Sequence, residues 1–397
     1  MDLLLHYYEL PKDLFITLKE EFHKKFCITI QNKLNSKFKN CFHLILKCPK
    51  YHSKRLFNKE IRFTIEELKE LQEFSDISKE ELELNIENIG NHEDGTIINN
   101  PKLPFHLKDI VYIASHLMFD GSYRKKKGCY FYSYEDTLTE YHKNRFSVFG
   151  DVPNNLIKEE NQLYFSYTLG YITSKLLEIP DFNSISVIIS NKLKILLKNN
   201  KILVDEFIKA MIIDEGQICD NIIVELGNEK LLRESHEIIS LYYKLNNITT
   251  RTRDYIYFKE ADKSYKNVKA WQFVFSSSSD KLLYESISPI PIDYKQKSLE
   301  LMYIRKTRSW FKRKRGETER LIIKSVLDNP KSVLELSYEL QVRNSVILKH
   351  IRGKNNSLIN LGLVQQIEER ILRKGGYAKA GIFGILDKEK AIRYLKK

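Results

Sequence analysis

The chain has 397 residues, 42% of them hydrophobic, and a formal net charge of +13 at pH 7. The five irregularly spaced cysteines exclude a disulfide framework, and the lack of any apolar run approaching about 18 residues excludes a membrane span. Residues 1–6 also lack the basic start and the apolar core of a signal peptide. We therefore expect a soluble, intracellular and cytoplasmic protein of two or three domains, whose basic surface favours polyanions such as nucleic acids.

Residues 1–104 are predicted to form a small, mostly helical accessory module. Capping-box patterns begin at Thr64 and at Ser78, and each precedes apolar residues at helical spacing. Two short capped helices with a tight break between them are compatible with a helix-turn-helix, and equally with any other small helical packing. The stretch 91–104 contains glycine, asparagines and two prolines, which predicts a linker to the next domain.

Residues 105–302 are predicted to form one domain that contains the same order of elements twice. Each half begins with an apolar helix that ends in an acidic residue and a glycine, continues with strand-like runs, and then has an amphipathic helix. The expected elements are 107–120, 129–134 and 138–149 in the first half, and 204–215, 221–226 and 229–245 in the second. Further strands are expected at 162–167, 253–259 and 270–276. The spacing between the halves is far longer than the roughly 20–50 residues of solenoid repeats, which indicates a duplicated half-domain.

Two acid–glycine pairs, Asp120-Gly121 and Glu215-Gly216, end the apolar helices and carry the strongest chemical prediction. Small residues in these helices let two helix backbones approach closely, so we expect the two acids to meet at the end of a helix pair. Glycine after each acid suits a helix C-cap and a sharp turn into a strand. Two neighbouring carboxylates repel each other, and a divalent cation such as Mg²⁺ or Mn²⁺ resolves the repulsion.

The chemistry expected at such a site is the hydrolysis of phosphodiester bonds, in which the bound cation activates water and steadies the leaving oxygen. An acid–glycine pair at a helix end is commonly structural, and a single copy would be interpreted that way. Two copies that each lead into the same order of elements favour a functional site. The predicted metal site consists of Asp120, Gly121, Glu215 and Gly216, with the two acids also catalytic.

A basic segment, 303–315, connects this domain to a third module and contains Trp310 and Phe311 among its charged residues. Such a basic run is usually a solvated helix face, and the aromatic residues among the basic ones strengthen the expectation of contact with phosphates. The third module, 316–397, is predicted to contain three helices and then two strands, in the order of a winged helix-turn-helix. These elements are expected at 317–327, from 332, at 345–352, at 364–373 and at 379–386. The third helix would present to a DNA groove Arg343, Asn344, Ser345, Lys349 and Arg352.

The stretch from about 105 to 302 resembles the LAGLIDADG homing endonucleases, in the two-repeat single-chain form found in archaeal proteins and inteins. The resemblance rests on the two motifs that end at Gly121 and Gly216, and on the segments Asn100–Pro104, Leu176–Pro180, Gly227–Leu232, Phe275–Pro291 and Lys295–Leu301. The second motif departs from the family pattern at Lys209, where a small residue is usual, and at Ile213, where an aspartate is usual. The resemblance implies an α+β fold in which two αββαββα repeats form a saddle around the motif helices, flanked here by the N-terminal module and the winged helix.

The resemblance also implies a function. The protein would be a monomeric, site-specific endonuclease that cuts double-stranded DNA with Mg²⁺ bound by Asp120 and Glu215, the last acid of each motif. The family also places a basic residue, and often a glutamine, near the scissile phosphate. In the second half these roles could be filled by Lys266, Lys269 or Gln272, and the first half offers no clear counterpart.

The sheets of such a saddle lie in the major groove, where Arg and Lys pair with guanine edges or phosphates. Candidate contacts in the first repeat are Tyr123, Arg124, Lys125, Lys126, Lys127, Tyr130 and Tyr132. The matching candidates in the second repeat are Gln217, Asp220, Arg251 and Arg253. For any single one of these residues, a solvated surface position is the alternative interpretation.

Two other functions are compatible with the same sequence. A transcriptional regulator could keep the endonuclease scaffold and bind DNA without cutting it, and the C-terminal winged helix favours this interpretation. The presence of both acids argues against it, because a protein that only binds DNA gains nothing from two buried carboxylates. An RNA-processing factor is the third possibility, because related scaffolds bind structured RNA.

Overall fold

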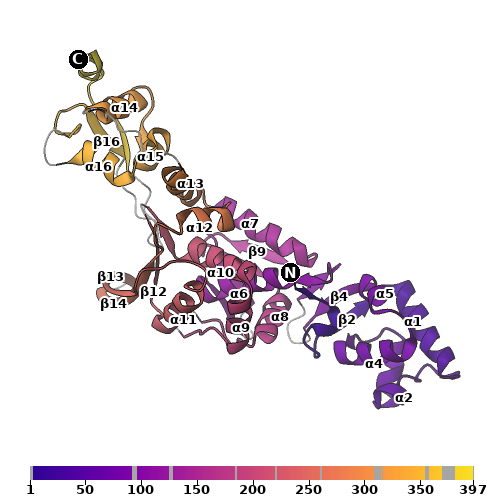
Figure 1. Ribbon diagram of the computed structural model, residues 1–397. Helices are drawn as coiled ribbons and strands as arrows, with labels where there is room; N and C mark the ends of the chain where they lie inside the picture. The colour runs from indigo at the N-terminus through magenta and orange to yellow at the C-terminus, as the bar shows by residue number, and fades with distance from the viewer. Residues whose placement is uncertain are drawn as a thin grey trace. The chain divides into compact units, whose positions relative to one another are not determined.

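The computed structural model describes residues 3–91, 96–124, 128–183, 186–219, 221–259, 262–307, 314, 316–353, 357–368 and 381–396. Over these residues it is a mixed α+β structure with several small antiparallel sheets, in agreement with the predicted class (Figure 1). The chain divides into two units: Met1–Glu215 with Leu226–Tyr242 and Thr250–Trp271, and Gly216–Glu225 with Tyr243–Thr249 and Gln272–Lys397. No helix within the described ranges is both long and apolar enough to cross a membrane.

The N-terminal part of the first unit contains a sheet as well as helices. The sheet has the order β3-β2-β4-β5 and is formed by β2 (Phe15–Leu18), β3 (Phe63–Thr64), β4 (Ile86–Gly90) and β5 (Ile97–Asn99). The helices are α1 (Glu20–Lys33), α2 (His43–Leu46), α3 (Lys50–Phe57), α4 (Ile65–Ser75) and α5 (Lys79–Leu84). Ile16, Ile89 and Ile98 are fully buried on the sheet. More residues of this module lie in helices than in strands, as predicted. The sheet was not predicted, because such short strands show too little alternation to be recognised.

Strand β5 lies inside the stretch 91–104, so the prediction of a linker there was wrong. Its residue Asn99 pairs with Asn88 of β4 and also forms a β-bridge to Asp151. Strand β1 (Leu4–Leu5) pairs with β6 (Phe105–His106), which directly precedes helix α6 (Leu107–Phe119). These pairings fasten the N-terminal part of the chain to the start of that helix.

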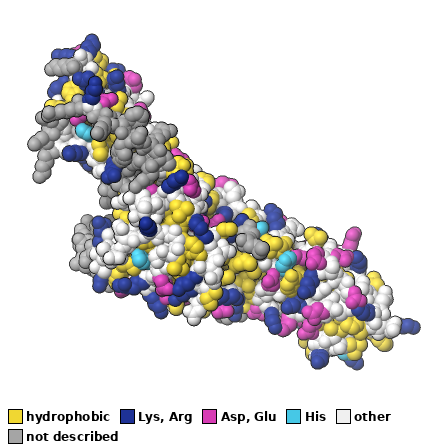
Figure 2. Space-filling view, viewed as in Figure 1, with side chains coloured by type: hydrophobic (Ala, Val, Ile, Leu, Met, Phe, Trp, Pro, Cys, Tyr) yellow, Lys and Arg dark blue, Asp and Glu magenta, His cyan; other side chains and the backbone are white. Residues whose placement is uncertain are grey.

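Helices α4 and α5 have the predicted caps. The side chains of Thr64 and Ser78 each accept a hydrogen bond, at 3.1 Å, from the N–H three residues further on. Asp76, with φ 61°, ends α4 in the left-handed region. The outward residues of α5 include the exposed Glu80 and the half-exposed Glu81, and Figure 2 shows acidic and basic side chains intermixed on this module. An acidic helix repels phosphates, so this helix pair does not favour contact with DNA.

The next part of the chain has one order of elements twice. The first copy consists of α6, β7 (Gly121–Arg124), β8 (Gly128–Tyr132), α7 (Asp136–Phe146), β9 (Asn154–Ile157), β10 (Gln162–Phe165) and α8 (Tyr167–Leu177). The second copy consists of α10 (Lys201–Asp214), β11 (Gly216–Ile218), β12 (Ile222–Leu226), α11 (Glu229–Ile239), β13 (Thr249–Lys259), β14 (Asp262–Val274) and α12 (Asp280–Ile287). The strand order is also the same, β7-β8-β10-β9 in one sheet and β11-β12-β14-β13 in the other.

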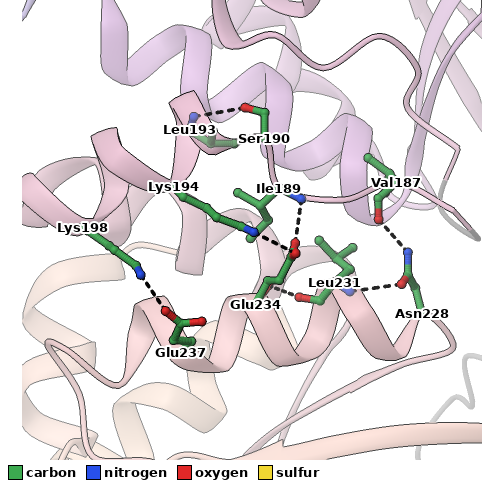
Figure 3. A network of polar contacts seen from close by, with 11 residues as sticks. Val187, Ile189, Ser190, Leu193, Lys194, Lys198, Asn228, Leu231, Glu234 and Glu237 are labelled. Atoms are coloured by element: carbon green, nitrogen blue, oxygen red, sulfur yellow. Dashed lines mark hydrogen bonds and ion pairs between the residues drawn. The ribbon is translucent and has the colours of Figure 1, made fainter.

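Helix α9 (Asn191–Asn199) was not predicted, and it is joined to α11 by ion pairs (Figure 3). The ammonium of Lys194 lies 2.8 Å from the carboxylate of Glu234, and that of Lys198 lies 2.6 Å from Glu237. Glu234 also accepts a hydrogen bond from the N–H of Ile189 at 2.9 Å. Helix α11 is thereby held to the segment of chain that leads into α10.

The C-terminal part of the second unit contains the three predicted helices and a small sheet. After α13 (Asp293–Thr307), its elements are α14 (Glu317–Val326), β15 (Lys331–Ser332), α15 (Val333–Leu340), α16 (Asn344–Arg352), β16 (Val364–Glu368), β17 (Ile382–Ile385) and α17 (Lys388–Lys396). The strands pair in the order β15-β17-β16 around a buried core that includes Ile322, Leu336, Ile347 and Phe383. The predicted turn at 374–376 and most of the basic segment, 308–313 and 315, lie outside the described residues.

Candidate active site

Helices α6 and α10 lie side by side and run in parallel (Figure 1). Near their N-terminal ends, the guanidinium of Arg145 lies 3.1 Å from Asp109 of α6 and 2.8 Å from Glu206 of α10. Near their C-terminal ends, the ring of His116 pairs with Asp214 at 2.9 Å. The two helices therefore run in the same direction, and the two acid–glycine pairs lie at the same end of the helix pair.

Asp120 and Glu215 directly follow these helices, and both are half-buried. The N–H of Asp120 donates to the carbonyl oxygen of His116 at 3.1 Å, and the N–H of Glu215 donates to that of Met211 at 2.9 Å. The carbonyl oxygen of Asp120 accepts a hydrogen bond from the N–H of Tyr132 at 3.1 Å, which joins this acid to the sheet. Each acid therefore has its backbone held by a helix end.

Gly121 is required by close packing and not by a left-handed backbone, since its φ is not positive. A Cβ at this position would lie 2.8 Å from the carbonyl oxygen of His116 and 2.9 Å from that of Tyr130. Backbone atoms cannot move aside as a flexible side chain can, so a larger residue would displace the start of β7 and with it Asp120. Its counterpart Gly216 is buried at the start of β11.

Tyr134 lies within electrostatic reach of both acids. Burial raises the pKa of the Tyr134 phenol, and the negative charges of Asp120 and then Glu215 raise that pKa further. The phenol therefore stays protonated at neutral pH and can donate a hydrogen bond near the acid pair. Tyr134 was not predicted as a site residue, although it lies in the aromatic run 130–134 of the sequence.

Asp214 is a second residue that the sequence analysis missed. Its side chain is 5% exposed, and its two carboxylate oxygens lie 3.0 and 2.9 Å from Nδ1 of His116. Burial, followed by the positive charges of Arg145 and Lys209, holds the pKa of His116 well below its usual value, so the ring is neutral. Nδ1–H then donates to the carboxylate, and this bond fixes the residue directly before Glu215.

A second buried histidine, His142, extends this polar cluster between α6, α7 and β8. Its Nδ1 lies 2.5 Å from the hydroxyl of Tyr112, and its ring centre lies 4.8 Å from that of His116. Burial holds the pKa of His142 well below its usual value, and the neighbouring His116 and Arg145 lower it further. The Nε2 atoms of both histidines are buried and have no hydrogen-bond partner within the described ranges.

The free energy of unfolding should therefore fall as the pH is lowered from 7.5 to 5.5. His116 and His142 have pKa values well below 6.5 in the folded protein. The unfolded chain binds more protons below that pH, and each histidine then removes about 1.4 kcal/mol of stability per pH unit. Urea unfolding at pH 7.5, 6.5 and 5.5 measures this slope, and His142→Gln should reduce it. An unchanged free energy across this range would contradict the buried, neutral state of both rings.

Lys269 and Gln272 were predicted to lie near the scissile phosphate, and both have contacts with neighbouring side chains. Lys269 is exposed, and its ammonium lies 5.4 Å from the ring centre of Trp271. Gln272 is half-buried and donates from Nε2 to the hydroxyl of Thr249 at 3.2 Å. These described contacts do not include the acid pair. Among the predicted DNA contacts of this repeat, Gln217 and Arg251 are exposed. The structure does not describe the side chains of Lys266 and Arg253, or any part of Asp220.

In the first repeat, the prediction that Tyr123 contacts DNA was wrong. Its side chain is 5% exposed, and its hydroxyl donates to that of Tyr167 at 3.1 Å, so Tyr123 belongs to the core. Tyr130 and Tyr132 are half-exposed on the opposite face of the sheet. The side chain of Arg124 and the residues Lys125, Lys126 and Lys127 lie outside the described residues.

The residues predicted for the C-terminal DNA contact share one helix and its cap. Arg343 is the N-cap of α16 and is exposed, as are Ser345, Lys349 and Arg352, while Asn344 is half-buried. The guanidinium of Arg352 donates to Gln366 of β16 and lies 5.0 Å from the ring centre of Phe383. Arg352 is thus tied to the sheet, whereas Arg343 and Lys349 extend from the surface of the helix.

The donor set at the helix ends fits a cation that takes only part of its ligands from protein side chains. Within the described ranges, no group of three or more His, Cys, Asp or Glu side chains could hold a metal ion. Mg²⁺ is commonly bound by one or two carboxylates and completes its shell with water and phosphate oxygens. Asp120 and Glu215 are the two carboxylates at this end of the helix pair that could hold such a cation.

The sequence matches no protein-family model, and a search of curated proteins also found no match. The assignment of a function therefore rests on the residues and on their geometry.

Proposed function

We propose that the protein is a monomeric, magnesium-dependent endonuclease that cuts double-stranded DNA at a specific site. The observation that carries this proposal is the parallel pairing of α6 and α10, which brings Asp120 and Glu215 to one end of one helix pair. A divalent cation relieves the repulsion between two such carboxylates. The net charge of +13 favours a polyanionic substrate.

The two copies of the α-β-β-α-β-β-α order would form the duplicated saddle of the LAGLIDADG homing endonucleases. The identical strand order of the two sheets supports this arrangement. Each copy contributes one acid at the end of its first helix, so each repeat would serve one strand of a DNA duplex. A chain that contains both repeats needs no second subunit to complete the site.

The side chains at the site have distinct proposed roles. Asp120 and Glu215 would hold Mg²⁺, or Mn²⁺ in its place, and the bound cation would activate water and stabilise the leaving oxygen. The protonated phenol of Tyr134 would donate a hydrogen bond to a phosphate oxygen near the acids. His116 would act as a positioning residue, since it holds Asp214, which directly precedes Glu215. Lys269 and Gln272 remain the proposed basic residue and glutamine of the second repeat.

The experiment that tests this function uses a plasmid library that covers candidate sites. The full chain is incubated with the library with and without Mg²⁺, and linear products are sequenced at their ends. The proposal expects double-strand breaks at one shared sequence, only in the presence of the cation. Absence of any linear product would overturn it.

The C-terminal module would bind DNA as a winged helix-turn-helix, with α16 in a groove. The order of its helices and strands and the exposed basic residues of α16 support this second contact. We expect Arg343→Gln with Lys349→Gln to weaken binding to all DNA sequences and to lower the slope of log affinity against log salt by about two. Fluorescence anisotropy at several salt concentrations measures both quantities. Lys24→Gln with Lys54→Gln, two exposed positions of the N-terminal module, is the matched control.

A DNA-binding regulator without nuclease activity is the second candidate. The observation that favours it is a C-terminal module whose core and basic helix do not involve the acid pair. In the plasmid experiment this candidate predicts DNA binding without a linear product. DNA binding without a linear product, in Mg²⁺ and also in Mn²⁺, would show that the protein is a regulator and not a nuclease.

A further inference from the structure

One face of the first sheet carries a row of side chains that crosses all four strands. Ser122 of β7 lies opposite Tyr130 of β8, Tyr130 lies opposite Tyr164 of β10, and Tyr164 lies opposite Asn155 of β9. The neighbouring residues on these strands, which include Phe131 and Leu163, point to the other face and are buried. The half-exposed Tyr130 and Tyr164 therefore lie on the face of the sheet that is opposite to this core, and the row ends at Ser122, which is buried.

Four tyrosines on this side of the sheet form a continuous aromatic surface, which we name the tyrosine strip: Tyr130, Tyr132, Tyr134 and Tyr164. The ring centre of Tyr130 lies 5.3 Å from that of Tyr164 and 5.5 Å from that of Tyr132. The rings of Tyr132 and Tyr134 are stacked at 6.0 Å with an angle of 7° between their planes. Since the N–H of Tyr132 donates to the carbonyl oxygen of Asp120 at 3.1 Å, the strip leads from the middle of the sheet to the first of the two acids.

Ser122, at the edge of the row, provides an independent observation. The residue is 5% exposed, and its hydroxyl is buried without a hydrogen-bond partner in the part of the chain that the structure describes. A buried hydroxyl without a partner costs free energy, and a bound molecule with a polar group would recover it. Ser122 is the cross-strand partner of Tyr130, so its hydroxyl belongs to a residue directly next to the aromatic part of the row.

The chemistry of this surface selects a particular state of the nucleic acid. Readout of an intact duplex uses Arg, Lys, Asn and Gln side chains that reach base edges in a groove. Aromatic rings instead bind bases through their faces, which are accessible only where the bases are unstacked or unpaired. Tyrosine hydroxyls, Gln162 and Asn155 add hydrogen-bonding groups around the rings, and Tyr164 already donates to Gln162 at 2.9 Å.

We propose that the tyrosine strip binds unstacked bases, so that the preferred DNA substrate carries unpaired or extruded bases on the side of the first repeat. This inference rests on the proposed nuclease function and adds the structural class of its substrate. Bases stacked on Tyr130 and Tyr164 would lead the adjoining backbone along the strip toward Asp120. The polar end of one such base would take the hydroxyl of Ser122 as its partner.

The test measures affinity of the full chain, by fluorescence anisotropy in Ca²⁺, for three DNA probes: a duplex, the same duplex with a short internal bulge, and the single strand. We expect the wild type to bind the bulged duplex at least about fivefold more tightly than the perfect duplex, as stacking of one base would give. Tyr130→Leu and Tyr164→Leu should each remove most of this preference, and Tyr130→Phe and Tyr164→Phe should retain it. Tyr51→Leu, at a residue that is 65% exposed on α3, is the control and should change nothing.

Different outcomes separate this inference from the proposed function. Equal affinity of the wild type for perfect and bulged duplexes, together with Mg²⁺-dependent cutting, would overturn the inference and leave the nuclease standing. The inference would also be overturned if both leucine variants have the melting temperature of the wild type and still bind the bulged duplex more tightly than the perfect duplex. A wild type that binds none of the probes and cuts no site of the plasmid library in Mg²⁺ would overturn both.

Discussion

Asp120→Asn and Glu215→Gln should each lower the rate of Mg²⁺-dependent DNA cleavage by about a thousandfold, while DNA binding is retained. Both amides have nearly the size of the acids they replace, so the helix ends keep their backbone bonds to His116 and Met211. The change removes a negative charge that the divalent cation needs, and with it the activation of water and the stabilisation of the leaving oxygen. Single-turnover cleavage of a defined duplex measures the effect.

The matched control for these variants is Glu237→Gln. Its carboxylate is 65% exposed and pairs with Lys198 on the surface, so the same loss of charge occurs away from the helix ends. We expect wild-type cleavage from this variant. If Asp120→Asn and Glu215→Gln cut as fast as Glu237→Gln, the acids do not hold the catalytic cation.

Arg145→Met should lower the free energy of unfolding by about 3–5 kcal/mol. Its guanidinium lies 3.1 Å from Asp109 and 2.8 Å from Glu206, and it covers the ring of Tyr112 at 4.2 Å. The side chain of Asp109 is 6% exposed, so the substitution leaves a buried carboxylate without this charged partner. Methionine retains much of the volume of the arginine side chain, so the loss of stability results from the missing charge and not from a cavity. Urea unfolding at pH 7.5 measures it.

Arg233→Met is the control for this second prediction. Arg233 is 57% exposed and pairs with Glu229 within one helix, an arrangement worth less than about 1 kcal/mol. A difference of less than about 1 kcal/mol between the two variants would contradict a structural role for Arg145. Such a role matters for function, since Arg145 joins the starts of α6 and α10, whose opposite ends carry the acids.

The parts of the fold that were predictable are those with a long and regular pattern. The helices that lead to Asp120 and Glu215 were placed to within a few residues, because each is a largely apolar stretch and a glycine after the last acid marks its C-terminal end. The caps at Thr64 and Ser78 were identified from their capping-box patterns alone, since a cap depends on residues three positions apart.

The parts that were not predictable depend on contacts between distant segments. His116 and Asp214 form a buried pair across two helices, and nothing in the sequence around either residue identifies the other. Tyr123 was placed on the wrong face because a strand as short as β7 does not fix which residues point outward, and a shift by one residue exchanges the faces. The N-terminal sheet was not predicted for a related reason, since its strands pair with strands that are far away in the sequence.

The most direct measurement of the central claim is a titration of Mn²⁺ into the full chain with its DNA, followed by the electron paramagnetic resonance signal of the free ion. The wild type should take up Mn²⁺, and the double variant Asp120→Asn with Glu215→Gln should lose this uptake. The double variant Glu229→Gln with Glu237→Gln, at two surface acids, should bind as the wild type does. Equal uptake of Mn²⁺ by the wild type and by the Asp120→Asn, Glu215→Gln protein would contradict the claim that these two acids form the metal site.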